Sequence, residues 1–176
     1  SVGEGHISSI AFREGIVEAD GSFEIWPQPN VATAAMLDKE QHDPDGSVCI
    51  HRHPESTLSG MVIFPMTEAQ RNGLEDLRLV RFEHGPADYE WIGTYTAYNG
   101  RDIRSELLRT RDFRACSLDP IHGIAGRNKG MALFPKKLGG RYYMLGRQDG
   151  KNLYLLSSDH LDRWDDDGLL LMEPKY

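Results

Sequence analysis

The sequence has little that would place the protein in a membrane, on nucleic acid or in a disulfide framework. No apolar run approaches the roughly 18 residues of a membrane-spanning helix, and no segment has the basic start and apolar centre of a signal peptide. The formal net charge of −7 argues against binding to a phosphate backbone, which requires a basic face. These absences predict no nucleic-acid partner, no membrane partner and a cytoplasmic location.

Cysteines and metal-ligand patterns are also sparse. Cys49 and Cys116 are far apart and form no C-x-x-C motif, which predicts reduced structural thiols and neither a disulfide nor a zinc site. His51 and His53 share one face of a predicted strand, but no third ligand follows at a useful spacing, so no metal ion is predicted. His6 is interpreted either as a channel-lining residue or as a structural one.

What the sequence does contain is a regular alternation of turn dipeptides and short strand-like runs. The turn dipeptides are Asp20-Gly21, Asp45-Gly46, Asn72-Gly73, Asn99-Gly100, Gly139-Gly140, Asp149-Gly150 and Asp167-Gly168. The runs between them, rich in β-branched and aromatic residues, are HISSIAF, FEIW, VCIHR, MVIFP, RLVRF, WIGTYTAY, MALFP, RYYMLGR and NLYLLSS. This pattern predicts an all-β meander of antiparallel strands. Only MTEAQRNGLEDL and RSELLRTRDF have helix-like spacing, and both are short enough to be turns or strands.

Two segments of the chain resemble each other. When LVRFEHGPADYEWIGTYTAYNGRDIRSELLRTRDF is laid over MALFPKKLGGRYYMLGRQDGKNLYLLSSDHL, both read strand, turn, aromatic strand, glycine turn and a strand with a double leucine. The double leucines are Leu107-Leu108 and Leu155-Leu156. Self-similarity at about 40 to 50 residues, with about four strands per unit, is typical of β-propeller blades. The alternative left open by spacing alone is a β-sandwich with a coincidental repeat.

The predicted fold is a single partial β-propeller domain spanning residues 1–176, with about two to three blades of four antiparallel strands. Its predicted segments are residues 1–65 with N-terminal hairpins, 66–125 and 126–176. In SSDHLDRWDD, Asp159 is expected to tie the outer turn of a blade, and Trp164 to pack between blades. Because propellers close with about four to eight blades, we expect a processed or partial chain, which begins at Ser1 and stops at LLLMEPKY before later blades.

The candidate chemistry lies in NGLEDLRLVRF, where Glu75 and Asp76 follow a turn and precede an apolar run with arginines. Strand alternation predicts that Glu75 and Asp76 diverge, and that Asp76 and Arg78 share a face beside the central channel. The two acids are therefore not a carboxylate dyad. Arg78 would favour ionised Asp76, whereas apolar burial would favour the protonated form that a general acid needs. The alternative is a turn in which the carboxylates cap free backbone N–H groups.

A second polar cluster comes later in the chain. GRNKGMALFP places Asn128 and Lys129 just before a strand, and MLGRQDG places Arg147 and Asp149 at the end of the next strand. By the repeat, Asn99 in YTAYNG is the counterpart in the first blade, so Asn99 and Arg147 are expected to approach the channel from adjacent blades. Cations concentrated there in an acidic chain predict a local anion site. The alternative is a set of solvated basic residues at loop ends.

One acid beside a cationic pocket favours phosphorolysis. Inverting glycoside hydrolysis needs two carboxylates far enough apart to admit a water, one as acid and one as base. Inorganic phosphate arrives already anionic, so cations replace the base.

An ordered set of motifs resembles a known family. The motifs GEGHISSI, VIFPM, NGLEDLRLVRF, YTAYNG, RNKGMALFP, LGRQDG and LLSSDHLDRWDD resemble glycoside hydrolase family 130, five-bladed propellers that include β-mannoside phosphorylases and some β-mannosidases. The resemblance runs over nearly the whole chain. It implies that Asp76, in the Gly-x-Glu-Asp-x-Arg motif, is the general acid and acts through a sugar hydroxyl. It also implies a substrate site of Glu75, Arg78, Asn99 and Asp149, and a phosphate site of Lys129, Arg147 and Asn128.

The resemblance implies a carbohydrate-active enzyme, or a fragment of one, that cleaves β-mannosides with inversion. Its ligands would be an oligosaccharide and inorganic phosphate as co-substrate, without a further cofactor. One alternative is a non-catalytic or incomplete propeller module that binds sugar, or that assembles with further copies or other chains to bury its open edges. Another alternative is a β-mannoside hydrolase of the same fold. Such an enzyme would have a base in place of the phosphate-binding cations, so the presence of Lys129 and Arg147 argues against it.

Two features depart from the family pattern. Leu77 stands at the variable position of the motif, where the family often has proline or alanine. Family members are also usually much longer, and their later blades normally complete both subsites.

Overall fold

The computed structural model describes residues 7–42 and 45–175 of the 176-residue chain. The described residues form strands, turns and two single-turn 3-10 helices, η1 (Glu68–Gln70) and η2 (Ala125–Arg127), so the all-β prediction is confirmed. Within these ranges no helix has the length and apolar character needed to cross a membrane. His6 lies outside the described residues.

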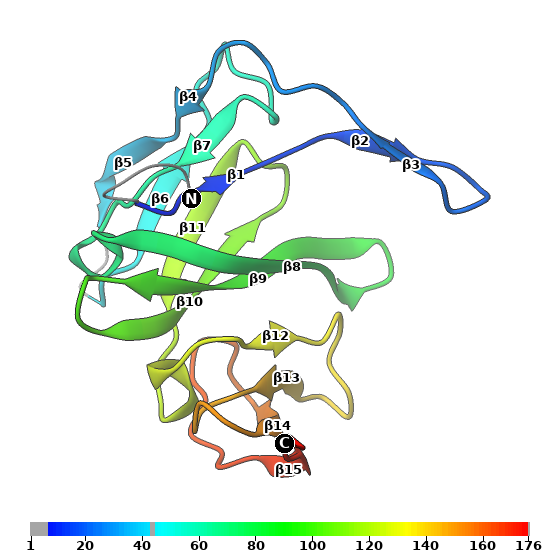
Figure 1. The fold of residues 1–176 in the computed structure, drawn as a ribbon, viewed down its shortest axis with the longest axis vertical. Coiled ribbons are helices and arrows are strands. Elements are labelled where there is room, and N and C mark those ends of the chain that lie inside the picture. Colours follow the sequence, from blue (N-terminus) through cyan, green and yellow to red (C-terminus); the bar gives the residue numbers. More distant parts are fainter. Residues whose placement is uncertain (1–6, 43–44, 176) are drawn as a thin grey trace.

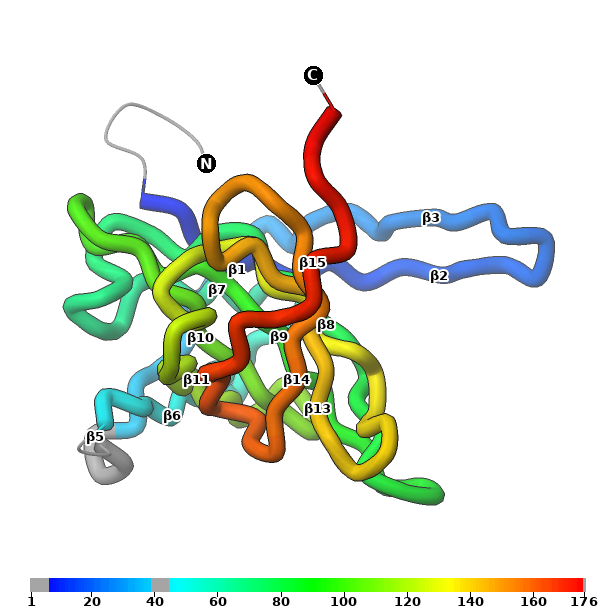
Figure 2. Tube along the Cα trace, turned by 90° about the horizontal axis from the view of Figure 1, so that it is seen from below, coloured from blue at the N-terminus to red at the C-terminus, as the bar shows by residue number. Residues whose placement is uncertain are grey.

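The described strands form a central sheet with smaller sheets around it (Figure 1). The central sheet has the order β5-β6-β11-β10-β9-β8, and its strands are β5 (Met36–His42), β6 (Val48–His51), β8 (Gly73–Gly85), β9 (Asp88–Tyr98), β10 (Ile103–Thr110) and β11 (Ala115–Pro120). Below it in Figure 1 lies the sheet of β12 (Ala132–Leu133), β13 (Tyr142–Gly146), β14 (Leu153–Ser158) and β15 (Leu169–Met172). Above it lie β1 (Ile10–Ala11), β7 (Met61–Ile63) and β4 (Thr33–Ala34). The hairpin of β2 (Gly15–Val17) and β3 (Phe23–Ile25) projects away from the body (Figures 1 and 2).

The predicted repeat corresponds to two antiparallel meanders, β8–β11 and β12–β15. In each meander consecutive strands are paired, which is the four-stranded unit of a propeller blade. The double leucines occupy the third strand of each unit: Leu107-Leu108 lies in β10 and Leu155-Leu156 in β14. The predicted fold class is therefore confirmed, with two blade units and further N-terminal strands.

Two of the N-terminal strands, β5 and β6, belong to the central sheet, whereas β1, β4 and β7 form a separate sheet. β6 pairs with β11, with Ile50 opposite Cys116 and Val48 opposite Leu118. All four of these side chains are buried in one apolar cluster, which explains why β6 covers the edge of the first meander. The predicted N-terminal segment, residues 1–65, therefore contributes strands both to the central sheet and to a separate sheet.

Two apolar clusters lie on opposite faces of the central sheet. The first, toward β1 and β7, includes Ile50, Ile63, Leu74, Tyr95 and Leu108. The second, toward β12–β15, includes Phe82, Ile92, Leu107, Met144, Leu156 and Trp164. Successive strand residues face opposite sides, so a double leucine marks a strand that is buried on both faces.

Trp164 connects the two meanders. It is fully buried in the second cluster, among side chains of β8, β9 and β10 on one side and of β13 and β14 on the other. Its indole Nε1 donates a hydrogen bond to the carbonyl of Leu161 at 2.7 Å, so burial leaves no unpaired polar group on this side chain. The predicted packing of Trp164 between blades is confirmed.

The turn after β14 is held by a hydroxyl group. Ser158 Oγ donates to the carbonyl of Arg163 at 2.6 Å, and the Ser158 side chain is nearly buried. The predicted tie through Asp159 is wrong, because this carboxylate is exposed and forms an ion pair with Arg141 at 3.3 Å. Ser158 ends β14 on its inward face, whereas the next residue is directed to solvent.

Candidate active site

The Asp76 segment of β8 contains a β-bulge. Glu75 pairs with Thr96 of β9 and Arg78 pairs with Thr94, so β8 has two residues between these pairs where β9 has one. Asp76 has a φ of 55°, in the left-handed region that few residues other than glycine adopt. β-Bulges recur next to active sites, where they redirect a side chain.

The bulge changes which side chains share a face. Residues directly opposite each other across two strands point to the same side, so Glu75 and Arg78 both lie on the face of Thr94 and Thr96. A regular strand would have placed Glu75 and Arg78 on opposite faces. Regular alternation predicted Glu75 on the face opposite Arg78; this part of the prediction is wrong, because the extra residue shifts the pattern by one and brings Glu75 to the face of Arg78.

Asp76 borders a small hollow between the two meanders. The hollow is a narrow crevice without room for a whole water molecule, and it is lined by Asp76, Thr94, Tyr95, Thr96, Ser105, Gly130 and Met131. Asp76 is exposed, and no residue in the described ranges donates a hydrogen bond to its carboxylate or forms an ion pair with it. Neither apolar burial nor the alternative of a capped backbone N–H is therefore observed at Asp76.

The loop before β12 is attached to the first meander by hydroxyl groups. Thr94 Oγ1 donates to the carbonyl of Met131 at 2.5 Å, and Ser105 Oγ donates to the carbonyl of Asn128 at 2.5 Å. The Asn128 side chain is also engaged, since its Nδ2 donates to the carbonyl of Gln148 at 3.1 Å. These bonds fix the loop at the rim of the Asp76 hollow.

Gly130 is the meeting point of several predicted site residues. Arg78 Nη1 donates to its carbonyl at 3.1 Å. A Cβ built on Gly130 would lie 3.5 Å from Cδ of Arg147, so the Arg147 side chain runs beside the loop. Lys129, the preceding residue, and Arg147 are both exposed. The structure therefore brings Arg78, Lys129 and Arg147 to one loop next to Asp76.

Asn99 and Asp149 occupy equivalent turns of the two meanders. Asn99 Oδ1 accepts hydrogen bonds from the backbone N–H groups two and three residues later, at 2.9 and 2.7 Å. Asp149 Oδ1 does the same, at 2.8 Å in both cases. Its backbone hydrogen bond from Lys151 and bonds from Asn152 and Tyr154 lower the pKa of Asp149 to about 2. Neither Asn99 nor Asp149 lines the Asp76 hollow, and their roles in substrate binding stay predictions.

A buried polar network next to the bulge was missed by sequence analysis. Tyr95, opposite the bulge, donates from its hydroxyl to Glu106 Oε2 at 2.5 Å. Gln70 Nε2 donates to both of these groups, and Arg104 Nε donates to Glu106 Oε1 at 2.7 Å. Burial, with the neighbouring Glu106 carboxylate, raises the pKa of Tyr95 well above its usual value. The sequence signal that could have indicated this network is Glu106, an acid directly before the double leucine in the buried strand β10.

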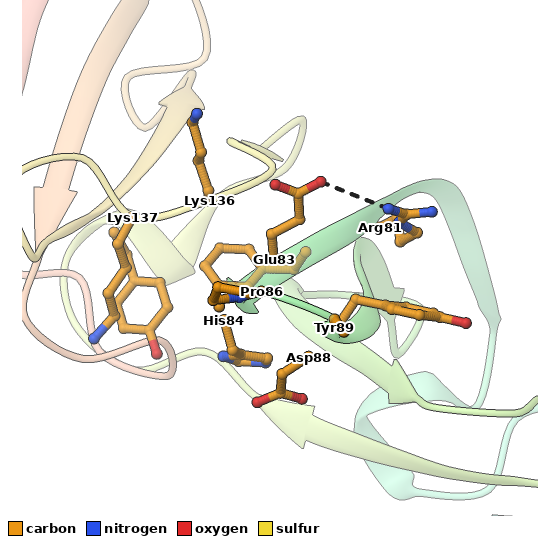
Figure 3. A pocket seen from close by; sticks show the side chains of 12 residues that line it. Arg81, Glu83, His84, Pro86, Asp88, Tyr89, Lys136 and Lys137 are labelled. Atoms are coloured by element: carbon orange, nitrogen blue, oxygen red, sulfur yellow. Dashed lines mark ion pairs between the residues drawn. The ribbon is translucent and has the colours of Figure 1, made fainter.

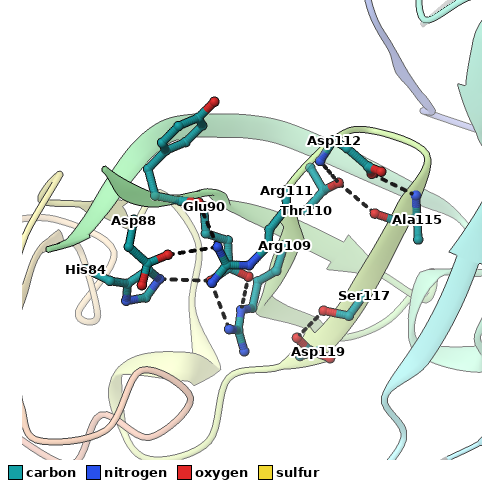
Figure 4. Close-up of polar contacts among 11 residues, drawn as sticks. His84, Asp88, Glu90, Arg109, Thr110, Arg111, Asp112, Ala115, Ser117 and Asp119 are labelled. Carbon is teal, nitrogen blue, oxygen red and sulfur yellow. Dashed lines mark hydrogen bonds and ion pairs between the residues drawn. The ribbon is translucent and has the colours of Figure 1, made fainter. Parts of the chain in front are cut away.

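A second buried acid lies on the opposite face of the central sheet (Figure 4). Glu90 accepts hydrogen bonds from Nε and Nη2 of Arg109, both at 3.0 Å, and its Oε2 lies 3.1 Å from Nε2 of His84. The three side chains belong to three adjacent strands. The Glu90 carboxylate on β9 thus contacts a side chain of each neighbouring strand, His84 on β8 and Arg109 on β10.

A larger hollow, of about 620 Å³, lies at the tip of the β8–β9 hairpin and not at Asp76 (Figure 3). Some of its charged groups contact other lining residues: Arg81 is 3.6 Å from Glu83 and 4.8 Å from the ring centre of Tyr89. Lys137 lies 4.2 Å from the ring centre of Tyr142. None of the predicted site residues lines this hollow, so size alone does not mark the candidate site.

Comparison with known proteins supports the fold. No protein-family model and no curated protein sequence matches the chain. Similar solved structures include a protein from Bacteroides ovatus provisionally assigned as a glycoside hydrolase, with a TM-score of 0.50 and 16% identity over 80% of this chain and 52% of its own. They also include the β-1,2-mannobiose phosphorylase from Listeria innocua in complex with β-1,2-mannobiose, with a TM-score of 0.49 and 18% identity over 97% and 52% of the two chains.

A third structure, from Parabacteroides distasonis and also provisionally assigned as a glycoside hydrolase, has a TM-score of 0.45 and 18% identity over 78% of this chain and 47% of its own. The chain spans about half the length of these proteins. At such identities the likeness concerns the fold alone.

Proposed function

We propose that the chain belongs to a carbohydrate-active enzyme that cleaves β-mannosides by inverting phosphorolysis, with Asp76 as the general acid. The observation that carries this proposal is the β-bulge, which removes the Asp76 carboxylate from the regular ladder and leaves it at the rim of a hollow. Left-handed backbone at a residue other than glycine costs on the order of 1–3 kcal/mol, and such strain is concentrated at functional sites. The motif resemblance and the glycoside-hydrolase-like fold support the same conclusion.

In the proposed reaction, an oxygen of phosphate attacks the anomeric carbon from the side opposite the glycosidic oxygen. The bond between the anomeric carbon and the glycosidic oxygen breaks. The Asp76 proton, relayed through a sugar hydroxyl, goes to the leaving oxygen. Asp76 remains as a carboxylate and regains a proton from solvent. The products are mannose 1-phosphate, with inverted anomeric configuration, and the released alcohol or sugar.

The cations beside Gly130 support a phosphate site. Lys129 and Arg147 are exposed; Lys129 precedes Gly130, which Arg78 contacts, and the Arg147 side chain runs beside Gly130. The guanidinium of Arg147 can contact two phosphate oxygens, whereas Lys129 adds a mobile point charge. In a chain with a net charge of −7, this local concentration of positive charge favours an anionic co-substrate.

The composition of the hollow favours phosphate over water as the nucleophile. Among the described residues that line it, Asp76 is the one carboxylate. An inverting hydrolase needs a second carboxylate to activate water. Phosphate needs no such base.

A second candidate function is supported by the exposed end strand of the second meander. All four residues of β15 are exposed, and all are apolar: Leu169, Leu170, Leu171 and Met172. Such a strand favours burial against further sheet units. On this alternative the chain is a non-catalytic or incomplete propeller module that assembles with further copies or with other chains.

The experiment uses mannose 1-phosphate with candidate acceptor sugars and measures released phosphate. We expect Asp76→Asn to lower turnover by about 10²- to 10⁴-fold, because the amide cannot supply the proton. Asparagine tolerates the left-handed backbone, so the variant keeps the bulge. The matched control is Asp159→Asn, which removes an exposed acid in the second meander and should leave turnover unchanged.

Turnover that survives in Asp76→Asn would exclude the proposed acid. Turnover absent from the wild-type chain, together with a size-exclusion mass above that of the monomer, would favour the assembly alternative.

A further inference from the structure

Three potential metal ligands meet at the edge of the central sheet that is farthest from Asp76. The sheet runs from β5 at one edge to β8 at the other. Cys49 and His51 are two residues apart on β6, so their side chains share a face. Asp38 follows Leu37 on β5, where the regular pairing with β6 ends. Ligand atoms of Asp38, Cys49 and His51 all lie within 4.8 Å of one another.

The contacts converge on one nitrogen of the histidine. His51 Nε2 lies 3.1 Å from Asp38 Oδ2 and 3.9 Å from Cys49 Sγ. In a nucleophilic triad the base uses one ring nitrogen for the nucleophile and the other for the carboxylate. Burial also raises the pKa of the Cys49 thiol, which is opposite to the activation of a nucleophilic cysteine. The arrangement therefore does not fit a catalytic triad.

The same arrangement fits the coordination shell of zinc. With bonds of about 2.0 to 2.3 Å to nitrogen, oxygen and sulfur, neighbouring ligands of a tetrahedral zinc ion are about 3.3 to 3.8 Å apart. The two separations from His51 Nε2, 3.1 and 3.9 Å, bracket this range. Small side-chain rotations would bring the three donors onto an ion.

We infer that Asp38, Cys49 and His51 form a binding site for a zinc ion. Thiolate, imidazole and carboxylate are ligands of zinc, whereas magnesium and calcium prefer oxygen alone. The thiolate and carboxylate together neutralise the two charges of the ion. The side chains of His51 and Asp38 are 43% and 24% exposed, so an ion can enter and a water can fill the fourth position.

The surroundings add further negative charge. Ser117 pairs with Cys49 across β11 and β6, and its Oγ donates to Asp119 Oδ2 at 2.8 Å (Figure 4). Asp119 lies two residues after Ser117 on β11, so the two side chains share a face of the strand. A cation at the Cys49 site would be stabilised by this second acid.

The site differs from the histidine pair visible in the sequence. His53 Nδ1 accepts a hydrogen bond from the backbone N–H of Glu55 at 3.2 Å, and His53 does not belong to the group around Cys49. The partner of His51 comes from β5, which sequence spacing could not indicate. His53 therefore provides a control for His51.

The test is a titration of the full, untagged chain with cobalt(II) under reducing conditions, followed by displacement with zinc. We expect one equivalent of cobalt to produce a thiolate-to-cobalt charge-transfer band that zinc removes. Cys49→Ser should abolish the band. His51→Ala should weaken cobalt binding by at least about tenfold, in line with the loss of a metal-site interaction.

Three controls make the result specific. Cys116→Ala removes the other, buried thiol and should leave the band intact, and His53→Ala should leave the affinity unchanged. Circular dichroism without metal checks that each variant is folded, and His51→Asn replaces any variant that is not. A wild-type chain without a stoichiometric band, a band that survives Cys49→Ser, or equal weakening by His51→Ala and His53→Ala would each overturn the inference.

Discussion

The two meanders have the same connectivity but different surroundings. The β8–β11 meander lies between two apolar clusters and carries two buried acids, Glu90 and Glu106, each held by an arginine. The β12–β15 meander packs against the rest of the molecule with a single apolar cluster, which contains Trp164, and its last strand is exposed. The same chain pattern is thus stabilised by internal polar networks where it is enclosed, and by an aromatic anchor where it is partly open.

Removing the anchor should have the largest effect. Trp164→Ala should lower the free energy of unfolding by about 3–5 kcal/mol, because it leaves a cavity between the two meanders. The control is Trp26→Ala, which removes a half-exposed tryptophan and should change stability by less than about 0.5 kcal/mol. Urea unfolding measures both values. Equal losses in the two variants would show that Trp164 does not join the meanders.

Neutralising the polar network of the first meander should have the next largest effect. Glu106→Gln keeps the shape of the side chain but removes the charge that accepts hydrogen bonds from Arg104 and Tyr95. We expect a loss of about 2–3 kcal/mol, since charged hydrogen bonds are broken in a buried setting. Glu83→Gln, in an exposed pair with Arg81, should cost less than about 0.5 kcal/mol. If denaturant titration gave the two variants the same stability, the network would contribute nothing.

The smallest effect concerns the equivalent turns at Asn99 and Asp149. The pKa of Asp149 is about 2 in the folded protein, below its ordinary value of 3.8, so the unfolded chain takes up the proton first as pH falls. The stabilisation by ionised Asp149 is complete above pH 3.8 and is lost as pH falls through about 2. The difference in Tm between wild type and Asp149→Asn should therefore shrink over this range. Asn99→Asp should introduce the same dependence into the first meander.

Thermal unfolding at a series of pH values measures these differences. If the Tm of wild type and of Asp149→Asn changed in parallel with pH, ionised Asp149 would not stabilise the turn. If the difference in Tm between wild type and Asn99→Asp did not change with pH, the two turns would not be equivalent.

Local patterns predicted the meanders because their signals lie within single strands and turns. The double leucines identified β10 and β14, and the glycine turns separated them from their neighbours. Pairing between distant segments was not predictable in this way. The addition of β6 to β11 depends on Val48 and Ile50 reaching one apolar cluster, which alternation within β6 alone does not specify.

The candidate site shows the same limit. The motif located Glu75, Asp76 and Arg78, but the relative directions of Glu75 and Arg78 depend on how β8 is aligned with β9. Counting residues along one strand could not show the extra residue between Glu75 and Arg78. Asp38 was missed for a similar reason, since its neighbours Cys49 and His51 belong to another strand.

Because Asp76 is the extra residue of the bulge, the pairing of β8 with β9 does not depend on it. Without residue 76, Glu75 would still face Thr96, Leu77 would stand opposite Tyr95, and every later side chain of β8 would keep its present side. A single-codon insertion into an ordinary ladder is enough to create this position. Chemistry at Asp76 could thus arise or disappear in evolution while the scaffold around it stayed intact.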